Sequence, residues 1–349
     1  MRPSGIEYHL ATLDGEGPWS EWMRCSGRSA LVFGQRNESV RHGQFGARSL
    51  TAMLHYVRRE HISAIYVCGV RAAFILRWMK PVMPGVKIVQ GVRWNPDSDS
   101  GLDRGFRLSE RWFHGLLDGY ITNSRVAVET LIRRCGIPAS MVDVIYNGLA
   151  DIPRDIPSIR NRPMEVLTVA NLAPRKGILE YLEAVHLVLE SVPDARFVLV
   201  GRDDMNGVVQ RAIDAQGLSQ TVSYEGFQAD VTPYYSRARV VVLPSLWNEG
   251  CPTTLLESLA WGSPVVAYGI DGIPELVDNG VDGFHVPPRD VRGLAAHVIN
   301  LLRNTTLAEN LGLSGRRKVA ERFTIESCAH LHEKFFTDLC TARAAATQG

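Results

Sequence analysis

The strongest constraint on the fold of this chain is a regular alternation of short apolar runs with helical patterns. Four such runs mark the first half: Ile62–Val70, Val86–Val92, Gly119–Ser124 and Met141–Leu149. Six more mark the second half: Met164–Asn171, Ala195–Gly201, Thr221–Phe227, Ala238–Ser245, Ser263–Gly269 and Gly283–Pro288. Short apolar strands that alternate with helices are typical of parallel sheets covered by helices on both faces. The sequence therefore predicts an α/β fold of two doubly wound domains in tandem.

Length and one proline-rich segment predict the domain boundaries. A chain of 349 residues exceeds one ordinary hydrophobic core. Residues 151–163 hold three prolines and mixed charges without periodicity, which is typical of a linker. We expect Rossmann-like domains over residues 1–150 and 164–322, followed by a C-terminal helix and tail over 323–349, for which a return to the first domain is one option. Ligands of such sheets bind at the carboxyl ends of strands, so the cleft between the domains is the expected site.

Composition bounds the class of protein and its surroundings. Hydrophobic residues make up 45% and charged residues 21%, as in soluble globular proteins, and a formal net charge of +1 gives no indication of a nucleic-acid partner. No apolar run approaches the roughly 20 residues that cross a bilayer, and no secretory signal pattern opens the sequence. The six cysteines are scattered without metal-ligand spacing, which suits a reducing compartment. A cytoplasmic protein without a metal is the expectation.

Two glutamates, Glu249 and Glu257, stand eight residues apart around a predicted helix start. Proline at 252 suits the first helical turn and glycine at 262 suits the helix end. Glu249 then lies in the preceding loop, and Glu257 lies too far along the helix to share a proton with it. The two carboxylate oxygens of Glu257 suit a vicinal diol such as a ribose, whereas Glu249 can accept hydrogen bonds from sugar hydroxyls. The alternative is that neither residue binds a ligand: Glu257 would be a surface residue of the helix, and Glu249 would cap the helix start.

The start of the same helix is an expected anion site. Backbone N–H groups at a helix N-terminus point outward and favour a phosphate or diphosphate. The residues of this segment are Gly250, Cys251, Pro252, Thr253 and Thr254.

A second cluster, Arg175 and Lys176, follows the carboxyl end of a predicted strand. Two adjacent cations at this place suit a diphosphate leaving group. The alternative is a pair of solvated loop residues.

Together these stretches resemble the second domain of the GT-B-fold retaining glycosyltransferases of family 4 (glycosyl transferases group 1), which include glycogen and sucrose synthases. Glu249 and Glu257 match the E-x7-E element of that family, and "DGIPELVDNGVDG" (Asp271–Gly283) matches its GG-x-P-E segment. The resemblance extends over roughly residues 119–325 and includes Val200-Gly201 and "SYEGF" (Ser223–Phe227). It implies a retaining hexosyltransferase that moves a sugar from a nucleotide-diphosphate donor to a hydroxyl acceptor, a glycan or lipid-linked sugar, in cell-surface polysaccharide or glycolipid biosynthesis. It implies no cofactor.

The resemblance also assigns roles to residues. Glu249 would face the donor sugar, Glu257 would hold the ribose, and Lys176 would meet the diphosphate. Gly226 and Phe227 would lie near the base. One departure concerns Asn171, because the family often has an arginine five residues before that lysine. Asparagine donates a hydrogen bond but brings no charge, and Arg175 can compensate.

The first domain departs further from the family pattern. Residues 1–13 resemble the glycine-rich loop and helix of the family with the first strand missing, so that Gly5 matches a loop glycine and Glu7 starts the helix. The expected histidine near the donor sugar is not evident, and Arg93 and Trp94 stand there instead. They suit an acceptor, with the tryptophan stacked on a sugar, or an ordinary surface loop.

Three further interpretations stay open. "DSD" (Asp97–Asp99) matches a metal-binding motif of another glycosyltransferase fold only superficially. The basic and aromatic stretch Arg71–Lys80 suits either a sheet-covering helix or peripheral contact with the inner face of a membrane. Alternative functions are a nucleotide-sugar epimerase and a non-catalytic binding subunit descended from a transferase.

Overall fold

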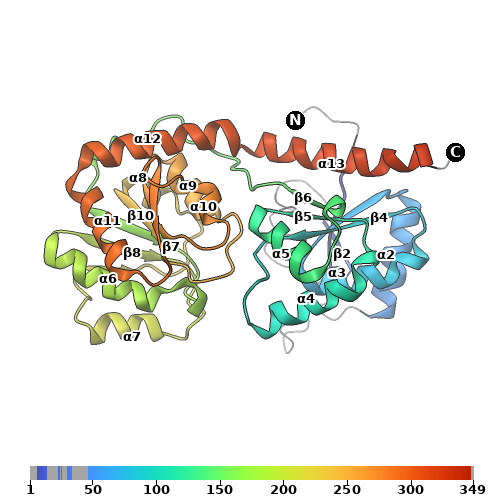
Figure 1. Cartoon of the computed structure of the whole chain (residues 1–349), viewed down its shortest axis with the longest axis horizontal. Coiled ribbons are helices and arrows are strands. Elements are labelled where there is room, and N and C mark those ends of the chain that lie inside the picture. Colours follow the sequence, from blue (N-terminus) through green and yellow to red (C-terminus); the bar gives the residue numbers. More distant parts are fainter. Residues whose placement is uncertain (1–5, 14–22, 24, 26–29, 34–45, 347–349) are drawn as a thin grey trace. The chain divides into compact units, whose positions relative to one another are not determined.

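The computed structural model describes residues 6–13, 23, 25, 30–33 and 46–346, and these divide into two compact units (Figure 1). Unit 1 comprises residues 1–91, 113–120 and 332–349, and unit 2 comprises residues 92–112 and 121–331. The predicted α/β class with two Rossmann-like parts is confirmed, since parallel strands alternate with helices in both halves of the sequence.

The sheet of the first half has the strand order β3 (Ala64–Cys68), β4 (Lys87–Val92), β5 (Gly119–Thr122) and β6 (Val142–Val144). Strands β3 and β4 pair in parallel, and all four residues of β5 are buried. Burial on both faces of the sheet explains why these strands are mainly apolar. The helices of this half are α2 (Ala47–Arg59), α3 (Val70–Met79), α4 (Gly101–Phe113) and α5 (Arg125–Cys135).

The N-terminal prediction is wrong in one respect. A helix was expected from Glu7, but Glu7 precedes a strand, β1 (Leu10–Thr12), which pairs in parallel with β2 (Ala30–Val32). The structure thus has a strand in the stretch for which the sequence predicted none. Apolar and β-branched residues across the ladder favour this pairing over the local helical pattern. Gly5 lies outside the described residues.

The sheet of the second half has six parallel strands in the order β12-β11-β10-β7-β8-β9. Their bounds are Glu165–Val169 (β7), Arg196–Val200 (β8), Val222–Tyr224 (β9), Val240–Leu243 (β10), Val265–Tyr268 (β11) and Gly283–Val286 (β12). The chain builds outward from β7 through β8 to β9, and then crosses to β10 on the other side. The switch point therefore lies between β7 and β10, where open α/β sheets bind ligands.

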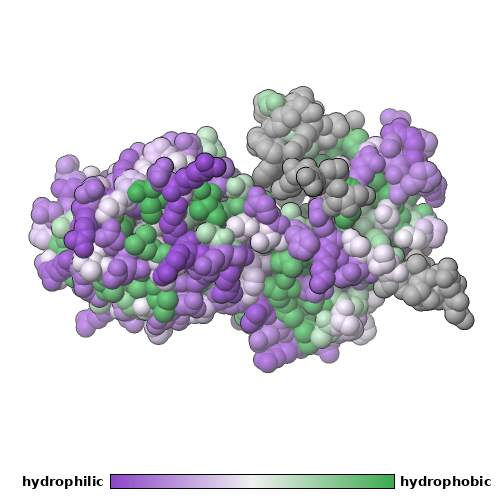
Figure 2. Space-filling model, turned by 90° about the horizontal axis from the view of Figure 1, so that it is seen from above, coloured by the Kyte–Doolittle hydropathy of each residue, from purple (hydrophilic) through white to green (hydrophobic). Residues whose placement is uncertain are grey.

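Helices cover both faces of this sheet. Their bounds are Ile178–Ser191 (α6), Val208–Ala215 (α7), Thr232–Arg237 (α8), Thr253–Ala260 (α9), Ile273–Leu276 (α10), Val291–Arg303 (α11) and Thr305–Arg322 (α12). Neighbouring strand residues serve opposite faces: Val166 and Val240 belong to a large core cluster, whereas Leu167 and Val241 belong to a smaller one beneath α8. Seen from the side of α12, the surface of unit 2 is mostly hydrophilic with smaller apolar areas (Figure 2).

The last helix, α13 (Ile325–Ala346), follows α12 after the break expected near residue 323. Its end from His332 onward belongs to unit 1. There the ring of Tyr66, on β3, meets the rings of His332 and Phe336 edge to face.

The expected linker is held firmly against the second half. Arg162 is 3% exposed and donates hydrogen bonds to the carbonyl oxygens of Pro157, Ala238 and Trp261 and to the hydroxyl of Ser263. Burial lowers the pKa of this guanidinium to about 10. An apparently irregular segment therefore contributes a polar anchor to unit 2.

Candidate functional site

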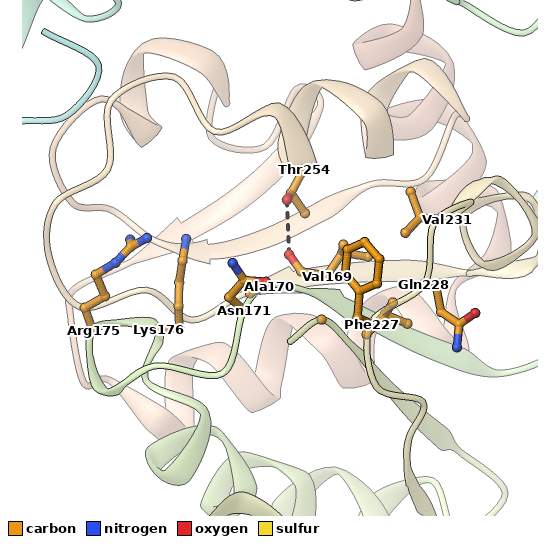
Figure 3. Close-up of a pocket in the computed structure, with 11 residues that line it drawn as sticks. Val169, Ala170, Asn171, Arg175, Lys176, Phe227, Gln228, Val231 and Thr254 are labelled. Atoms are coloured by element: carbon orange, nitrogen blue, oxygen red, sulfur yellow. Dashed lines mark hydrogen bonds between the residues drawn. The ribbon is translucent and has the colours of Figure 1, made fainter. Parts of the chain in front are cut away.

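A pocket of about 310 Å³ opens at the carboxyl ends of β7 and β8, beside the switch point. Its lining residues are Val169, Ala170, Asn171, Arg175, Lys176, Val200, Gly201, Phe227, Gln228, Val231 and Thr254. The two cations lie at one end, and Phe227, Gln228 and Val231 lie at the other (Figure 3). A pocket of this size suits a small molecule, and its two ends differ in chemistry.

Five predicted site residues meet in this pocket: Asn171, Arg175, Lys176, Phe227 and Thr254. They come from three segments that are far apart in sequence: the loop after β7, the segment after β9 and the start of α9. The sheet brings them together because its parallel strands all end at the same edge. Sequence reasoning missed the pocket residues Gln228 and Val231, which carry no motif and become visible only through their place after β9.

Lys176 reaches the site through a short 3₁₀ turn, Pro174–Lys176, that ends at Gly177. Gly177 has φ +63°, and a Cβ there would overlap the carbonyl oxygen of Pro244. The turn thus passes directly over the end of β10, where the Leu246 N–H donates to the Arg175 carbonyl at 2.8 Å. Glycine is required here by both backbone conformation and space.

The ammonium group of Lys176 donates to Oε1 of Glu249, and the two side chains are only 11% and 7% exposed. Nη1 of Arg175 lies 3.5 Å from the same oxygen, but its side chain is 40% exposed. Burial lowers the pKa of Lys176, and the negative charge of Glu249 opposes that shift. Each member of such a buried ion pair depends on the other, because a single charge left there would be desolvated without a partner.

The loop that carries Glu249 is held by a second carboxylate, Asp271. The Glu249 N–H donates to Oδ2 of Asp271 at 3.0 Å, and Nδ2 of Asn95 donates to Oδ1 at 2.7 Å. Thr130 in turn donates to Oδ1 of Asn95 at 2.8 Å. Asn248 and Asp271 both have positive φ, 63° and 46°. Burial raises the pKa of Asp271, while the hydrogen bond from Asn95 lowers it.

Sequence reasoning did not identify Asp271 as a site residue. The signal was present, because Asp271 occupies the first glycine position of the GG-x-P-E pattern. An aspartate at positive φ, where glycine is the usual residue, indicates that the side chain is required.

The helix predicted to separate the two glutamates is α9, which begins at Thr253 with Pro252 as its N-cap. Thr254 donates through Oγ1 to the Val169 carbonyl at 3.1 Å, which ties the helix start to β7 (Figure 3). Glu257 accepts a hydrogen bond of 2.7 Å from the Tyr235 hydroxyl, and burial raises its pKa. Glu249 and Glu257 therefore have separate partners, and their geometry does not make them an acid–base pair.

The residues before α9 contact two parts of unit 2 that come earlier in the sequence, residues 92–112 and 121–147. The Cys251 carbonyl accepts from Nδ2 of Asn147 at 2.6 Å, and Arg93 donates to Oδ1 of the same asparagine. A Cβ on Gly250 would overlap the amide oxygen of Asn123. Burial raises the pKa of the Cys251 thiol to about 12, which keeps it protonated at neutral pH and unsuited to nucleophilic attack.

The predicted acceptor residue Trp94 is half-buried. Its Nε1 donates to Oδ1 of Asp103 at 3.1 Å, and its ring packs at a tilt against Phe106, with 5.3 Å between centroids. In the neighbouring "DSD" stretch, Asp97 pairs with Arg134 at 2.8 Å. Within the described residues no cluster of three or more potential metal ligands occurs.

The segment after β9 carries the residues expected near a base. Gly226 has φ +68° and accepts a hydrogen bond of 2.8 Å from the Gly201 N–H. Phe227 is 71% exposed and forms one wall of the pocket. On the other side, Oδ1 of Asn171 accepts from the Arg202 N–H at 3.1 Å, so its amide nitrogen is the group that can face a ligand.

Comparison with known proteins gives two family matches. Residues 163–304 match the family described as "Glycosyl transferases group 1", and residues 1–151 match "Glycosyltransferase Family 4". The amylovoran biosynthesis glycosyltransferase AmsK of Erwinia amylovora is 29% identical over 197 residues, which cover 54% of this chain and 48% of that protein. The phosphatidyl-myo-inositol mannosyltransferase of Mycobacterium leprae is 31% identical over 204 residues, 56% of this chain and 54% of that protein. The chain thus matches about half the length of these relatives.

Solved structures share the architecture over almost the whole chain. A glycosyltransferase from Rickettsia africae superposes with a TM-score of 0.78 at 15% identity, covering 95% of this chain and 90% of that one. Anabaena Alr3699/HepE in complex with UDP and glucose gives a TM-score of 0.75 at 19% identity, covering 93% and 90%. At these identities the likeness shows the fold alone, and it confirms the GT-B architecture expected from the sequence.

One finding bears on membranes. Among the helices of the described residues, none is both long and apolar enough to pass through a bilayer.

Proposed function

We propose that this chain, which its family matches and its fold identify as a GT-B glycosyltransferase of group 1, transfers a sugar from a nucleotide-diphosphate donor to a hydroxyl acceptor. The observation that carries the proposal is the pocket at the switch point, with Lys176 and Arg175 at one end and Phe227 at the other. Cations suit the diphosphate and an exposed aromatic ring suits the base. Anabaena Alr3699/HepE, which shares the fold, was crystallised with UDP-glucose.

In the proposed reaction the bond between the anomeric carbon and the diphosphate oxygen breaks. The acceptor oxygen bonds to that carbon from the same face, which retains the configuration. The acceptor proton passes to the departing phosphate oxygen, so no side chain has to act as a nucleophile. Lys176, together with the N–H groups at the start of α9 near Cys251 and Thr254, would stabilise the charge that develops on the diphosphate.

Glu249 has a positioning role in this scheme. Its carboxylate is bound by Lys176 and Arg175, and it lies at the tip of a loop that Asp271 holds. Donor binding would draw the two cations toward the diphosphate and leave oxygens of Glu249 for the sugar hydroxyls. Glu257 and Gly226 would contact the ribose and base.

The acceptor would bind on the side of Arg93 and Trp94. We propose a glycan or lipid-linked sugar as the acceptor and a place in cell-surface polysaccharide or glycolipid synthesis, at the inner face of a membrane. Support comes from relatives named for amylovoran and colanic acid biosynthesis, and from a diphosphoundecaprenol galactosyltransferase of Escherichia coli that is 26% identical over 211 residues. The epimerase and the non-catalytic subunit are not favoured, because the relatives that match are predominantly named as transferases.

We retain the domain division at residues 150 and 164 as part of the proposal. The two family matches end at 151 and begin at 163, which supports it. The first half would then serve the acceptor and the second half the donor.

The test combines donor binding with turnover of Lys176→Ala. A nucleotide-sugar that binds the native state raises the melting temperature, so a screen of UDP-, GDP- and ADP-sugars identifies the donor. With that donor, we expect Lys176→Ala to lower kcat roughly 100-fold or more, because a charged donor to the leaving group is lost. Lys334→Ala, an exposed lysine on α13, is the control and should retain full turnover. Full turnover in Lys176→Ala would refute the assigned role.

A further inference from the structure

Helix α4 (Gly101–Phe113) presents apolar and basic side chains together on its solvent side. Leu108 and Trp112 are 61% and 72% exposed, and Arg104 and Arg111 are exposed beside them. Positions 104, 108, 111 and 112 are separated by four, three and one residues, which places them on one side of an α-helix. We call these four residues the α4 face.

The acidic residues of α4 lie on its other side. Asp103 and Glu110 are fully buried together with Phe106. Asp103 accepts hydrogen bonds from Trp94 and from the Ser98 N–H, so its carboxylate is bound inside the protein and is not exposed on the surface of α4. Within α4, all of which the structure describes, the exposed charges are therefore only positive.

The basic stretch that the sequence singled out for membrane contact, Arg71–Lys80, has a different character. Arg77 is 1% exposed and donates to Oε1 of Gln90 at 3.2 Å. Lys80 forms an ion pair with Asp118. The exposed residues Phe74 and Trp78 pack edge to face, 6.2 Å apart. Arg77 and Lys80 are thus engaged inside unit 1, and the large exposed side chains of the stretch are aromatic.

We propose that the α4 face docks on the surface of an anionic lipid bilayer. Trp112 and Leu108 would enter the interface between headgroups and acyl chains, where large apolar side chains and indole rings are favoured. Arg104 and Arg111 would meet the phosphates of the headgroups. Each basic side chain near an anionic surface strengthens binding about fivefold, and the attraction extends over about one Debye length.

The charge of the α4 face favours an anionic lipid surface over other binding partners. An exposed face that mixes cations with large apolar groups, and holds its carboxylates inside, matches a surface that is anionic outside and apolar beneath. The proposal rests on the membrane location that forms part of the proposed function and names the surface that would meet the membrane, but docking itself requires no donor and can be measured apart from transfer.

The test is sedimentation of the full chain with vesicles of phosphatidylcholine alone, and with vesicles of an equal mixture of phosphatidylcholine and phosphatidylglycerol. We expect binding to the anionic vesicles only, and weaker binding as salt is raised. The double variant Arg104→Gln with Arg111→Gln should lose roughly twentyfold in partition coefficient, as two cations are removed. Trp112→Ala should lose roughly tenfold.

Matched variants on α12 control for general effects of charge and hydrophobicity. Arg317→Gln removes an exposed arginine, and Leu313→Ala removes a leucine that is 49% exposed. Both should bind vesicles as the wild type does, and all variants should keep the wild-type melting temperature because the mutated side chains are exposed. Equal binding to neutral and anionic vesicles, or α4 variants that bind like the controls, would overturn the proposal. Donor binding measured in the same preparations reports on the transferase function separately.

Discussion

Glu249 is held from two directions at once. Its carboxylate faces Lys176 and Arg175, and its backbone N–H is fixed by Asp271, which in turn is bound by Asn95. The first set of contacts sets the charge at the pocket, and the second sets the position of the loop. A side chain that only positions a sugar needs such support, because errors of about 1 Å in placement cost large factors in rate.

Asp271 offers a test of this arrangement through pH. Burial raises its pKa, so protonation begins at a higher pH than for an ordinary aspartate. Protonation removes acceptor strength toward the Glu249 N–H, and activity should therefore fall as the pH is lowered through that raised pKa. In Asp271→Asn, which tolerates positive φ, we expect kcat to fall roughly tenfold and this acidic limb to disappear.

The pH profile of kcat/KM provides the measurement. Asp97→Asn serves as the control, because Asp97 is an exposed aspartate paired with Arg134 at the surface. It should reproduce the wild-type profile. An unchanged acidic limb in Asp271→Asn would show that another group titrates there, and Asp271 would lose its positioning role.

At the scale of elements, the pattern of apolar runs predicted all ten strands from β3 to β12, because the strands of a sheet covered on both faces are mainly apolar. The strand β1 was not predicted, because two of its three residues are exposed and it therefore lacks the apolar pattern of a buried strand. The helix α9 and its separation of Glu249 from Glu257 followed from proline and glycine signals alone. The hydrogen bonds of Asp271, Asn95 and Asn147 did not, because they join loops that only the fold brings together.

The turn after β7 carries a requirement that can be measured. Gly177 has positive φ and no room for a Cβ, whereas Gly217 has φ +70° with open space around it. Gly217→Ala should therefore cost only the conformational strain, about 1–2 kcal/mol. Gly177→Ala should cost at least about 1 kcal/mol more in the free energy of unfolding, because overlap with the Pro244 carbonyl adds to the strain.

Denaturant unfolding of the two variants measures this difference. Gly177→Ala should also weaken donor binding, because a shift of the turn displaces Lys176 from Glu249. Equal unfolding free energies for the two variants would mean that the turn relaxes without strain, and that Lys176 does not depend on this backbone path.

At the scale of the molecule, the sequence predicted the α/β class and a boundary between two halves. It also predicted that a ligand binds at the carboxyl ends of the parallel strands. It predicted a linker over residues 151–163 from prolines and mixed charges. Arg162 is one of those charged residues, yet its side chain is buried among carbonyl groups. Composition cannot distinguish a solvated arginine from a buried anchor, because the difference lies in which carbonyls the fold leaves without partners.

Arg162 thus has a structural role that its neighbour Arg160 lacks. Arg160 is 60% exposed and pairs with Glu309 at the surface, where an ion pair contributes about 0–1 kcal/mol. Arg162→Met would remove the donor to the carbonyls of Pro157 and Trp261, whereas the Ala238 carbonyl would still accept from the Ser263 hydroxyl, so we expect a loss of roughly 2–3 kcal/mol. Arg160→Met should lose no more than about 1 kcal/mol. Thermal unfolding of both variants makes the comparison. Similar melting temperatures would mean that residues 151–163 behave as a free linker, and a much lower one for Arg162→Met would establish this segment as part of unit 2.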